Sequence, residues 1–202
     1  MIRLSPLMIA LTSALTLSAC GGGEDSSDDA PAPVAESVVQ PEVKQSSLQV
    51  TVIDGYLQKA KVWLDTNKNG LKDVGEPSAI TGVGGKASLD VSAINNPEQY
   101  PLIAVATKGV TIDEDNNTPV EKDYVLTAPK GKLIITPLTT IVKNKMNKGL
   151  SAAEAFVETA NELGLAQDSL LIDYKKEQLA EASFAAKMLV QLDILPKTEQ
   201  EA

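Results

Sequence analysis

A series of short strand-like segments after residue 47 most constrains what this chain can fold into. Residues 48–53 read LQVTVI, so that three aliphatic positions alternate with their neighbours in the period of two typical of a half-buried strand. Further strand-like segments, each set off by Gly, Pro or Asn, cover residues 60–64, 86–91, 101–107, 109–112, 123–128 and 132–136. Several short strands at this spacing predict a small β-sandwich over residues 48–135.

The pattern changes near Thr136, and residues 136–202 are predicted to form a helical segment. Thr136 is a good N-cap, and Pro137 suits the first helical position because the N–H it lacks would have no partner there. The helix that begins at this point is expected to stop near Gly149.

Two more helices are expected after Gly149. Ser151 and Glu154 have the spacing of a capping box, and Gly164 is placed to end the helix that this box begins. A third helix is predicted over residues 174–195, with a broad apolar stripe. This stripe consists of Leu179, Phe184, Met188, Leu192 and Leu195. We expect the three helices to pack together and against the sandwich.

Between two of the predicted strands lies the sequence DTNKNGLKDVGE, residues 65–76. Counted from its first residue, side-chain oxygens stand at positions 1, 3, 5, 9 and 12, with glycine at position 6 and a backbone carbonyl for position 7. This spacing matches the calcium loop of EF-hand proteins. The predicted cofactor is therefore Ca²⁺, and its predicted ligands are Asp65, Asn67, Asn69, Leu71 through its carbonyl, Asp73 and Glu76. A plain acidic turn is the alternative, because Asp, Asn and Gly are also turn formers.

The flanks of this loop argue against a helical EF-hand. Residues 60–64 are strand-like, and Glu76 precedes Pro77, which steers it away from helical angles. Lys72 occupies position 8, which is usually aliphatic in loops that pair with a second loop. The sequence therefore predicts a single site mounted on a sheet, rather than a sensor that opens a helix pair.

Residues 54–91, DGYLQKAKVWLDTNKNGLKDVGEPSAITGVGGKASLDV, resemble the B-type repeats of bacterial surface adhesins and, more broadly, carboxypeptidase-regulatory-like domains. The resemblance implies an immunoglobulin- or transthyretin-like sandwich whose loop ion stiffens the module. It also implies the loop side chains as ligands. The expected fold class is thus mainly β with α, a small sandwich of this kind followed by a short helical C-terminal segment.

The start of the chain predicts export and lipidation. Residues 1–19 combine a positive start at Arg3 with an apolar run that is short for a membrane span, as in a signal peptide. The run ends in LSAC, which resembles the lipobox of bacterial lipoproteins and implies that Cys20, the only cysteine, carries the lipid. An ordinary secretory signal with a chance cysteine is the alternative.

Residues 20–47 begin with this cysteine and are otherwise mostly Gly, Ser, Pro and acidic residues, a composition that predicts a disordered acidic tether. Gly21, rather than Asp, follows the cysteine, which resembles the pattern of lipoproteins sent to the outer membrane. The expected location is therefore the outer membrane, on its periplasmic face or at the cell surface.

The amino-acid composition excludes several classes of function. The formal charge of −9 argues against a nucleic-acid partner, because phosphate contacts need clustered Lys and Arg. The chain has no histidine, which removes Ser-His-Asp and Cys-His chemistry and most zinc sites. No catalytic residues are predicted, and the chain is expected not to be an enzyme.

These observations lead to an expected role and two alternatives. The leading hypothesis is a lipid-anchored envelope protein with a calcium-stabilised sandwich and a structural or adhesive role. The alternatives are a glycan- or peptide-binding module and a periplasmic assembly factor, in both of which calcium is only structural. Trp63 is the candidate for contact with a ligand, with packing as its plainer explanation. The expected partners are the membrane and a protein or glycan at the envelope.

Overall fold

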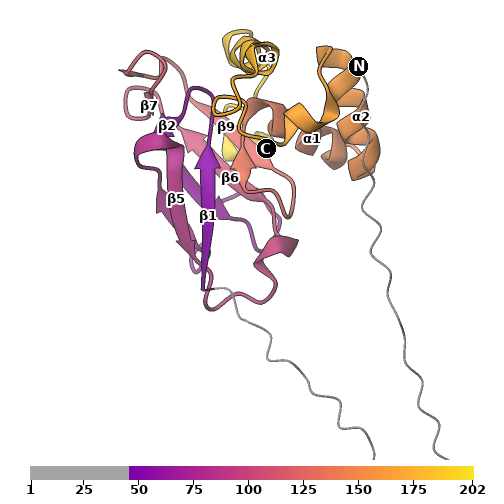
Figure 1. Ribbon diagram of the computed structural model, residues 1–202. Helices are drawn as coiled ribbons and strands as arrows, with labels where there is room; N and C mark the ends of the chain where they lie inside the picture. Colours follow the sequence, from indigo (N-terminus) through magenta and orange to yellow (C-terminus); the bar gives the residue numbers. More distant parts are fainter. Residues whose placement is uncertain (1–45) are drawn as a thin grey trace, which may run out of the picture. The chain divides into compact units, whose positions relative to one another are not determined.

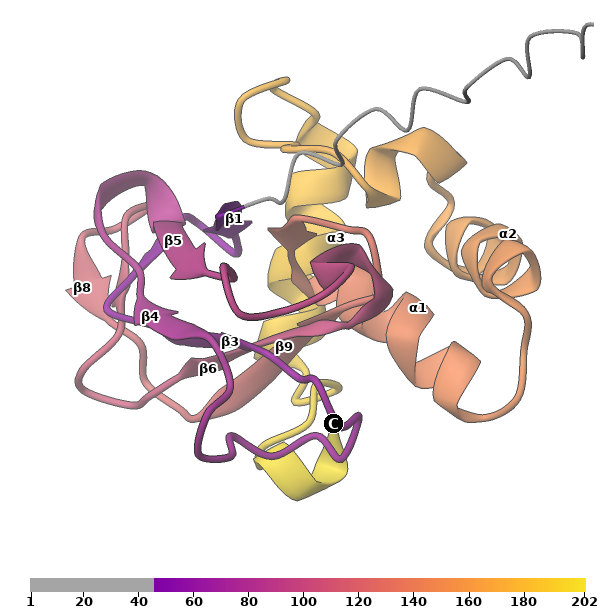
Figure 2. The ribbon, with the colours of Figure 1, turned by 90° about the horizontal axis from the view of Figure 1, so that it is seen from below.

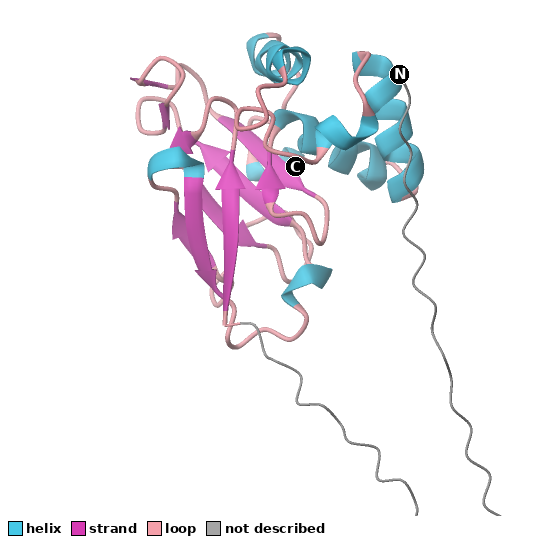
Figure 3. Ribbon diagram, viewed as in Figure 1, coloured by secondary structure: helices cyan, strands magenta, loops and turns pink. Residues whose placement is uncertain are grey.

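The computed structural model describes residues 46–202, and they form two main β-sheets, a small third sheet and three α-helices (Figures 1 and 3). The predicted signal peptide, Cys20 and nearly all of the tether lie outside these residues. The mainly-β class with added helices is confirmed. Within the described part of the chain, no helix has both the length and the apolar character that crossing a membrane requires.

The first sheet has β1 at its centre. Its strands are β1 (Ser47–Val52), β5 (Lys86–Asp90) and β10 (Ile134–Ile135). β5 pairs with β1 antiparallel from Ser47 opposite Asp90 to Thr51 opposite Lys86, and β10 pairs with the other side of β1 in parallel. The alternation read in residues 48–53 is observed along β1, where Leu48, Val50 and Val52 are buried.

The second sheet is antiparallel throughout, in the order β4-β3-β6-β9. Its strands are β3 (Lys61–Leu64), β4 (Ser78–Ile80), β6 (Leu102–Ala106) and β9 (Tyr124–Ala128). The third sheet is small, in the order β2-β7-β8. It is built from β2 (Leu57–Gln58), β7 (Ile112–Asp113) and β8 (Thr118–Pro119). The sequence reading missed β2, β4 and β8, each only two or three residues long.

The two main sheets share one hydrophobic core, and Figure 2 shows them as two layers. Side chains from β1, β3, β5, β6, β9 and β10 all enter this core. Residues of the three helices belong to the same core, including Leu138, Ala155 and Ala186. The helical segment is therefore packed as part of the same unit as the sheets.

Helix α1 (Pro137–Asn147) begins as its sequence predicts. The Thr136 hydroxyl accepts a hydrogen bond from the Thr139 N–H, and the Thr139 hydroxyl accepts one from the Thr136 N–H. The Thr139 hydroxyl also donates to the carbonyl of Thr127, and the Thr140 hydroxyl accepts from the Thr127 N–H. These buried hydroxyls attach the start of α1 to β9.

Helix α2 (Ala152–Leu163) also confirms its caps, the reciprocal hydrogen bonds of Ser151 with Glu154 and the left-handed Gly164. Both α2 and α3 contact α1, as expected for helices that pack together. Short 3-10 turns complete the chain at Val83–Gly85, Pro97–Gln99, Gln167–Leu170 and Glu199–Glu201.

The prediction of a helix over residues 174–195 is wrong at both ends, because α3 spans only Ala180–Gln191. Residues 174–178 form turns, and Gln178 has a φ of +55°, which is incompatible with a continuous right-handed helix. The Asp173 side chain caps this turn by accepting a hydrogen bond from the Lys176 N–H at 2.9 Å.

The predicted apolar stripe is wrong at Phe184, which is 66 % exposed, and at Leu192, which is 60 % exposed, whereas Leu195 is buried and Leu179 packs against the core. The fully buried positions of α3 are Ala182, Ala186 and Leu189. Small alanines let this helix approach its neighbours closely, a contact that a search for large apolar residues does not reveal.

The last residues of the chain turn back to the outer face of the second sheet. The Val125 N–H donates to the carbonyl of Pro196 at 2.8 Å. Trp63, Ile103 and Val125 form a second, smaller apolar cluster, against which Ala202 packs. We call residues 195–202 the return segment. It makes the second sheet a buried layer near β3 and β9 rather than a solvent-facing one.

Candidate metal centre

The predicted calcium loop joins two neighbouring antiparallel strands, β3 and β4. Trp63 pairs with Ser78, and the Leu64 N–H donates to the carbonyl of Pro77 at 3.0 Å, so the hydrogen-bonded ladder continues to the base of the loop. A strand enters the loop and a strand leaves it. The prediction that the loop is mounted on a sheet rather than between helices is confirmed.

Asp65 holds the first half of the loop. Its side chain is buried, and its two carboxylate oxygens accept hydrogen bonds from the N–H groups of Asn69 at 3.2 Å and Gly70 at 3.0 Å. Gly70 has a φ of +81°, a backbone conformation that side chains with a Cβ disfavour. This glycine lets the chain reverse sharply enough for its N–H to point back at Asp65.

Asp73 brings the middle of the loop together. Its Oδ2 accepts hydrogen bonds from the side-chain amides of Asn67 and Asn69, both at 2.7 Å. These two hydrogen bonds lower the pKa of Asp73, since they favour its charged form. The side-chain oxygens of these two amides accept hydrogen bonds from the loop backbone. The Asn67 oxygen accepts from the Asn69 N–H at 3.1 Å, and the Asn69 oxygen accepts from the Leu71 N–H at 2.8 Å.

Glu76 closes the loop from its far end. It is 8 % exposed, and its Oε1 accepts from the Thr66 N–H at 2.7 Å while its Oε2 accepts from the Asp73 N–H at 3.1 Å. The last predicted ligand is therefore folded back over the second residue of the loop. Its carboxylate spans both halves, as a bidentate ligand at position 12 must.

The structure thus joins the five predicted side-chain ligands in one hydrogen-bonded network. The set contains three carboxylates and two amide oxygens, a composition of hard oxygen donors suited to Ca²⁺. Residues 46–202 hold no group of three or more His, Cys, Asp or Glu placed to bind a metal. The amide oxygens of Asn67 and Asn69 each accept one backbone hydrogen bond, which leaves each oxygen a second lone pair for an ion. The types of oxygen donor in the loop fit calcium. In this structure, hydrogen bonds within the loop hold these donors together. The other predicted functional residue, Cys20, lies outside the described residues.

The return segment reaches this loop, which the sequence reading missed. The Glu199 carboxylate accepts a hydrogen bond from the Lys72 N–H at 3.1 Å. A Cβ on Gly70 would lie 3.1 Å from the carbonyl oxygen of Glu199, so the two backbones run close together. Lys72 and Glu199 are 127 residues apart, and no local pattern marks their contact.

Trp63 is a packing residue. Its side chain is fully buried on the outer face of the second sheet, and the Lys61 ammonium lies 5.7 Å from its ring centre. The plainer of the two explanations for this residue is confirmed. A ligand-binding role through an exposed Trp63 ring is wrong, because the return segment contributes to the cluster that buries it.

A second group of carboxylates lies near the small third sheet. Asp113 ends β7, Asp115 lies in the turn between β7 and β8, and Asp54 lies close to both. The pKa of Asp54 is raised to about 7, because burial and the negative charge of Asp113 disfavour its ionised form, opposed in part by the hydrogen bond from the Tyr124 hydroxyl. Burial likewise raises the pKa of Asp113. The Asp115 carboxylate forms an ion pair with Lys175.

Comparison of the chain with known protein families, with curated proteins and with solved structures finds no match. The fold and the loop chemistry described above therefore carry the functional argument.

Proposed function

We propose that this chain is a lipid-anchored protein of the bacterial outer membrane with a structural or adhesive role. Its fold is an immunoglobulin- or transthyretin-like sandwich, and Ca²⁺ bound in the loop of residues 65–76 stabilises it. Cys20 carries the lipid. Residues 20–47 place the folded part at a distance from the membrane surface, where it meets a protein or glycan partner of the envelope.

The observation that carries the calcium proposal is the position of the loop. Asp65 directly follows β3, Glu76 stands two residues before β4, and Asp73 lies between them. These three carboxylates lie within one short loop, and its backbone and side-chain amides hydrogen-bond each of them. A divalent cation bound by the same carboxylates would tie the end of β3 to the start of β4.

The position of the loop between two paired strands favours a calcium ion that stabilises the fold over one that switches its conformation. The strands on both sides are hydrogen-bonded in a sheet whose inner face belongs to the main core, so they cannot swing apart as the helices of a sensor do. The Glu199 contact with the Lys72 N–H adds the return segment to the parts that the loop positions. Calcium in this loop therefore holds three parts of the chain in one geometry.

The test is thermal unfolding of the full chain with calcium and with chelator. Free calcium at one hundred times its dissociation constant adds about 2.7 kcal/mol, which corresponds to a rise of roughly 5–10 °C for a domain of this size. The double variant Asp65→Asn with Glu76→Gln is expected to lose this rise. A matched control is Glu98→Gln with Glu121→Gln, which removes two exposed carboxylates outside the loop and should keep it. Equal midpoints for the native chain with calcium and with chelator would overturn the calcium proposal.

A further inference from the structure

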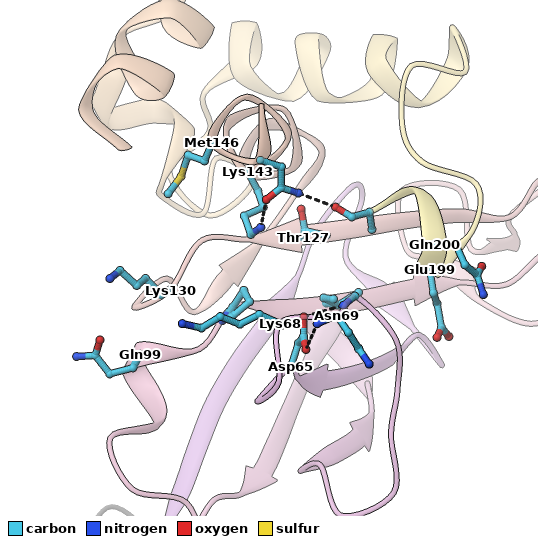
Figure 4. A pocket seen from close by; sticks show the side chains of 15 residues that line it. Asp65, Lys68, Asn69, Gln99, Thr127, Lys130, Lys143, Met146, Glu199 and Gln200 are labelled. Atoms are coloured by element: carbon cyan, nitrogen blue, oxygen red, sulfur yellow. Dashed lines mark hydrogen bonds between the residues drawn. The ribbon is translucent and has the colours of Figure 1, made fainter. Parts of the chain in front are cut away.

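A pocket of about 480 Å³ lies beside the loop, between the loop, helix α1 and the return segment (Figure 4). Its volume is in the range of about 300–1,000 Å³ typical of small-molecule sites. Asp65, Asn69 and Gly70 line it from the loop, Lys143 and Met146 from α1, and Gln200 from the return segment. The pocket shares Asp65 and Asn69 with the predicted calcium loop, but the calcium proposal does not assign the pocket a ligand.

Three lysines contribute to the pocket, although the chain as a whole is acidic. They are Lys68 in the loop, Lys130 after β9 and Lys143 on α1. No ion pair within residues 46–202 includes any of the three. Figure 4 shows Lys68 and Lys130 extending toward the same side of the pocket as Gln99, with Lys143 above them on α1. Three ammonium groups thus line one space without forming an ion pair, and the Asp65 carboxylate in the same lining is the charge that acts on Lys143.

The two acidic side chains in the pocket lining, Asp65 and Glu199, form hydrogen bonds with backbone N–H groups of the loop rather than with the lysines. Asp65 accepts hydrogen bonds from the Asn69 and Gly70 N–H groups, and Glu199 accepts one from the Lys72 N–H. In Figure 4 the Glu199 carboxylate points away from the three lysines. The positive charge on this side of the pocket is consequently not cancelled by direct pairing within the described chain.

Lys143 is the most informative of these lysines, because it is half-buried and its charged group donates to the amide oxygen of Asn147 rather than to a carboxylate. Burying an ammonium group is costly unless a charge partner is near. The hydroxyl of Thr127, also in the pocket wall, is buried and has no hydrogen-bond partner among the described residues. The Lys143 ammonium and the Thr127 hydroxyl can therefore each form further hydrogen bonds with a ligand in the pocket.

We propose that this pocket binds a small organic acid rich in hydroxyl groups, of the chemical class of an acidic sugar. The lysines supply the charge that a carboxylate requires. The side-chain amides of Gln99 and Gln200 can both donate to and accept from hydroxyl groups. None of the described residues that line the pocket is aromatic, so a neutral sugar has no ring on which to stack and its affinity has no strong source.

The test is a titration of the full chain, labelled with ¹⁵N and followed by its amide resonances, with three probes. D-galacturonate is expected to produce saturable shifts at residues that line the pocket. D-galactose, which has a hydroxymethyl group in place of the carboxylate, is expected to bind at least tenfold more weakly. Inorganic phosphate is the third probe, and it is expected to bind more weakly than galacturonate because it lacks the ring hydroxyl groups that would contact the amides. Calcium is removed beforehand with an immobilised chelating resin, so that the result does not depend on the metal proposal and no soluble polycarboxylate competes for the pocket.

The variants locate the binding. Lys143→Met is expected to weaken galacturonate binding at least tenfold, and Lys130→Met, at an exposed position where folding is not at risk, several-fold. The matched control is Lys86→Met, because Lys86 is exposed on β5 and does not line the pocket. Its affinity for galacturonate should equal that of the native chain.

Each opposite result overturns the proposal. Equal binding of galactose and galacturonate removes the role of charge, and phosphate binding as tight as galacturonate reduces the site to one for any bare anion. Unchanged affinity in both Lys143→Met and Lys130→Met, or shifts confined to residues outside the pocket, shows that the ligand binds elsewhere.

Discussion

Two acidic turns of this molecule have similar compositions and opposite electrostatics. Residues 65–76 join β3 to β4, and residues 114–117 join β7 to β8, and both are rich in Asp and Asn. In the first turn, amide N–H groups surround the carboxylates, and the pKa of Asp73 is lowered. Beside the second turn, burial and mutual repulsion raise the pKa of Asp54 and Asp113.

The difference shows that the surroundings of a carboxylate, rather than the number of carboxylates, decide what a cluster of acids binds. A loop whose backbone amides stabilise negative charge keeps its carboxylates ionised and available to a metal ion. A cluster that is partly buried and short of donors takes up protons instead. The experiments below test this contrast, from the largest expected effect to the smallest.

The largest effect is expected at Asp54. Its folded-state pKa of about 7 lies above the ordinary value of 3.8, so the folded chain binds the proton more tightly than the unfolded chain. Stability from this group is fully present below pH 4 and is lost as the pH rises through 7, at most about 4 kcal/mol in all. Asp54→Asn is expected to flatten this part of the pH profile of denaturant unfolding and to stabilise the chain at pH 8.

Asn at this position can still accept the hydrogen bond from Tyr124, which the native Oδ2 accepts at 3.2 Å. The control is Asp73→Asn, since the lowered pKa of Asp73 gives the opposite sign: stability present above the ordinary pKa and lost as the pH falls. If Asp54→Asn leaves the slope between pH 4 and 7 unchanged, Asp54 beside the second turn does not bind a proton in the way described.

A smaller effect is expected from glycine substitutions in the two regions. A Cβ on Gly55 would lie 2.0 Å from Asp113 Oδ1 and 2.5 Å from Asp115 Cγ, so Gly55→Ala must displace the second turn, at a cost of about 1–3 kcal/mol. A Cβ on Gly75 meets nothing within 4 Å, and its φ of +90° alone makes Gly75→Ala unfavourable, by about 1 kcal/mol.

Chemical denaturation at pH 7 measures both losses. Because the Gly55 contact is steric, its cost should not depend on calcium. The Gly75 cost should grow when calcium is present, if the loop must keep its shape to bind the ion. If, in chelator, Gly75→Ala lowers the free energy of unfolding more than Gly55→Ala does, then Gly55 is not the tightly packed position of the two.

The smallest effect without metal is expected at Asp73. Asp73→Asn keeps an oxygen for the amides of Asn67 and Asn69, so the thermal midpoint in chelator should be nearly unchanged. Calcium affinity is expected to fall on the order of tenfold, because one charged ligand is lost. Calorimetric titration with calcium measures this change, with Asp115→Asn in the second turn as the matched control, and equal losses in both would place the ion outside the first loop.

Much of the local structure could be predicted because its chemistry is local. Thr136, Ser151 and Gly164 act at helix ends through bonds to residues three or four positions away, and all three caps are confirmed. The spacing of residues 65–76 likewise predicted which side chains would meet, because a loop between paired strands has no room to separate them. Calcium binding by these side chains stays a prediction.

The rest depends on contacts that no local pattern encodes. The return segment is placed by Val125 with Pro196 and by Lys72 with Glu199, pairs distant in sequence and without a shared periodicity. The pocket with its three lysines exists only because this segment, α1 and the loop meet. The start of α3 depends on the left-handed Gln178 before it, and the buried face of α3 includes the small residues Ala182 and Ala186, which no stripe of large apolar residues marks.

The central place of β1 in its sheet has a mechanical consequence. β1 is hydrogen-bonded to β5 along five residue pairs on one side and to β10 along two pairs on the other. A pull on the chain at Ser46 along the axis of this strand loads both rows of bonds in shear, so they must break together rather than one after another. An attachment through the residues before β1 therefore transmits force into the strongest direction of the sheet, and the load enters the fold far in sequence from the helices.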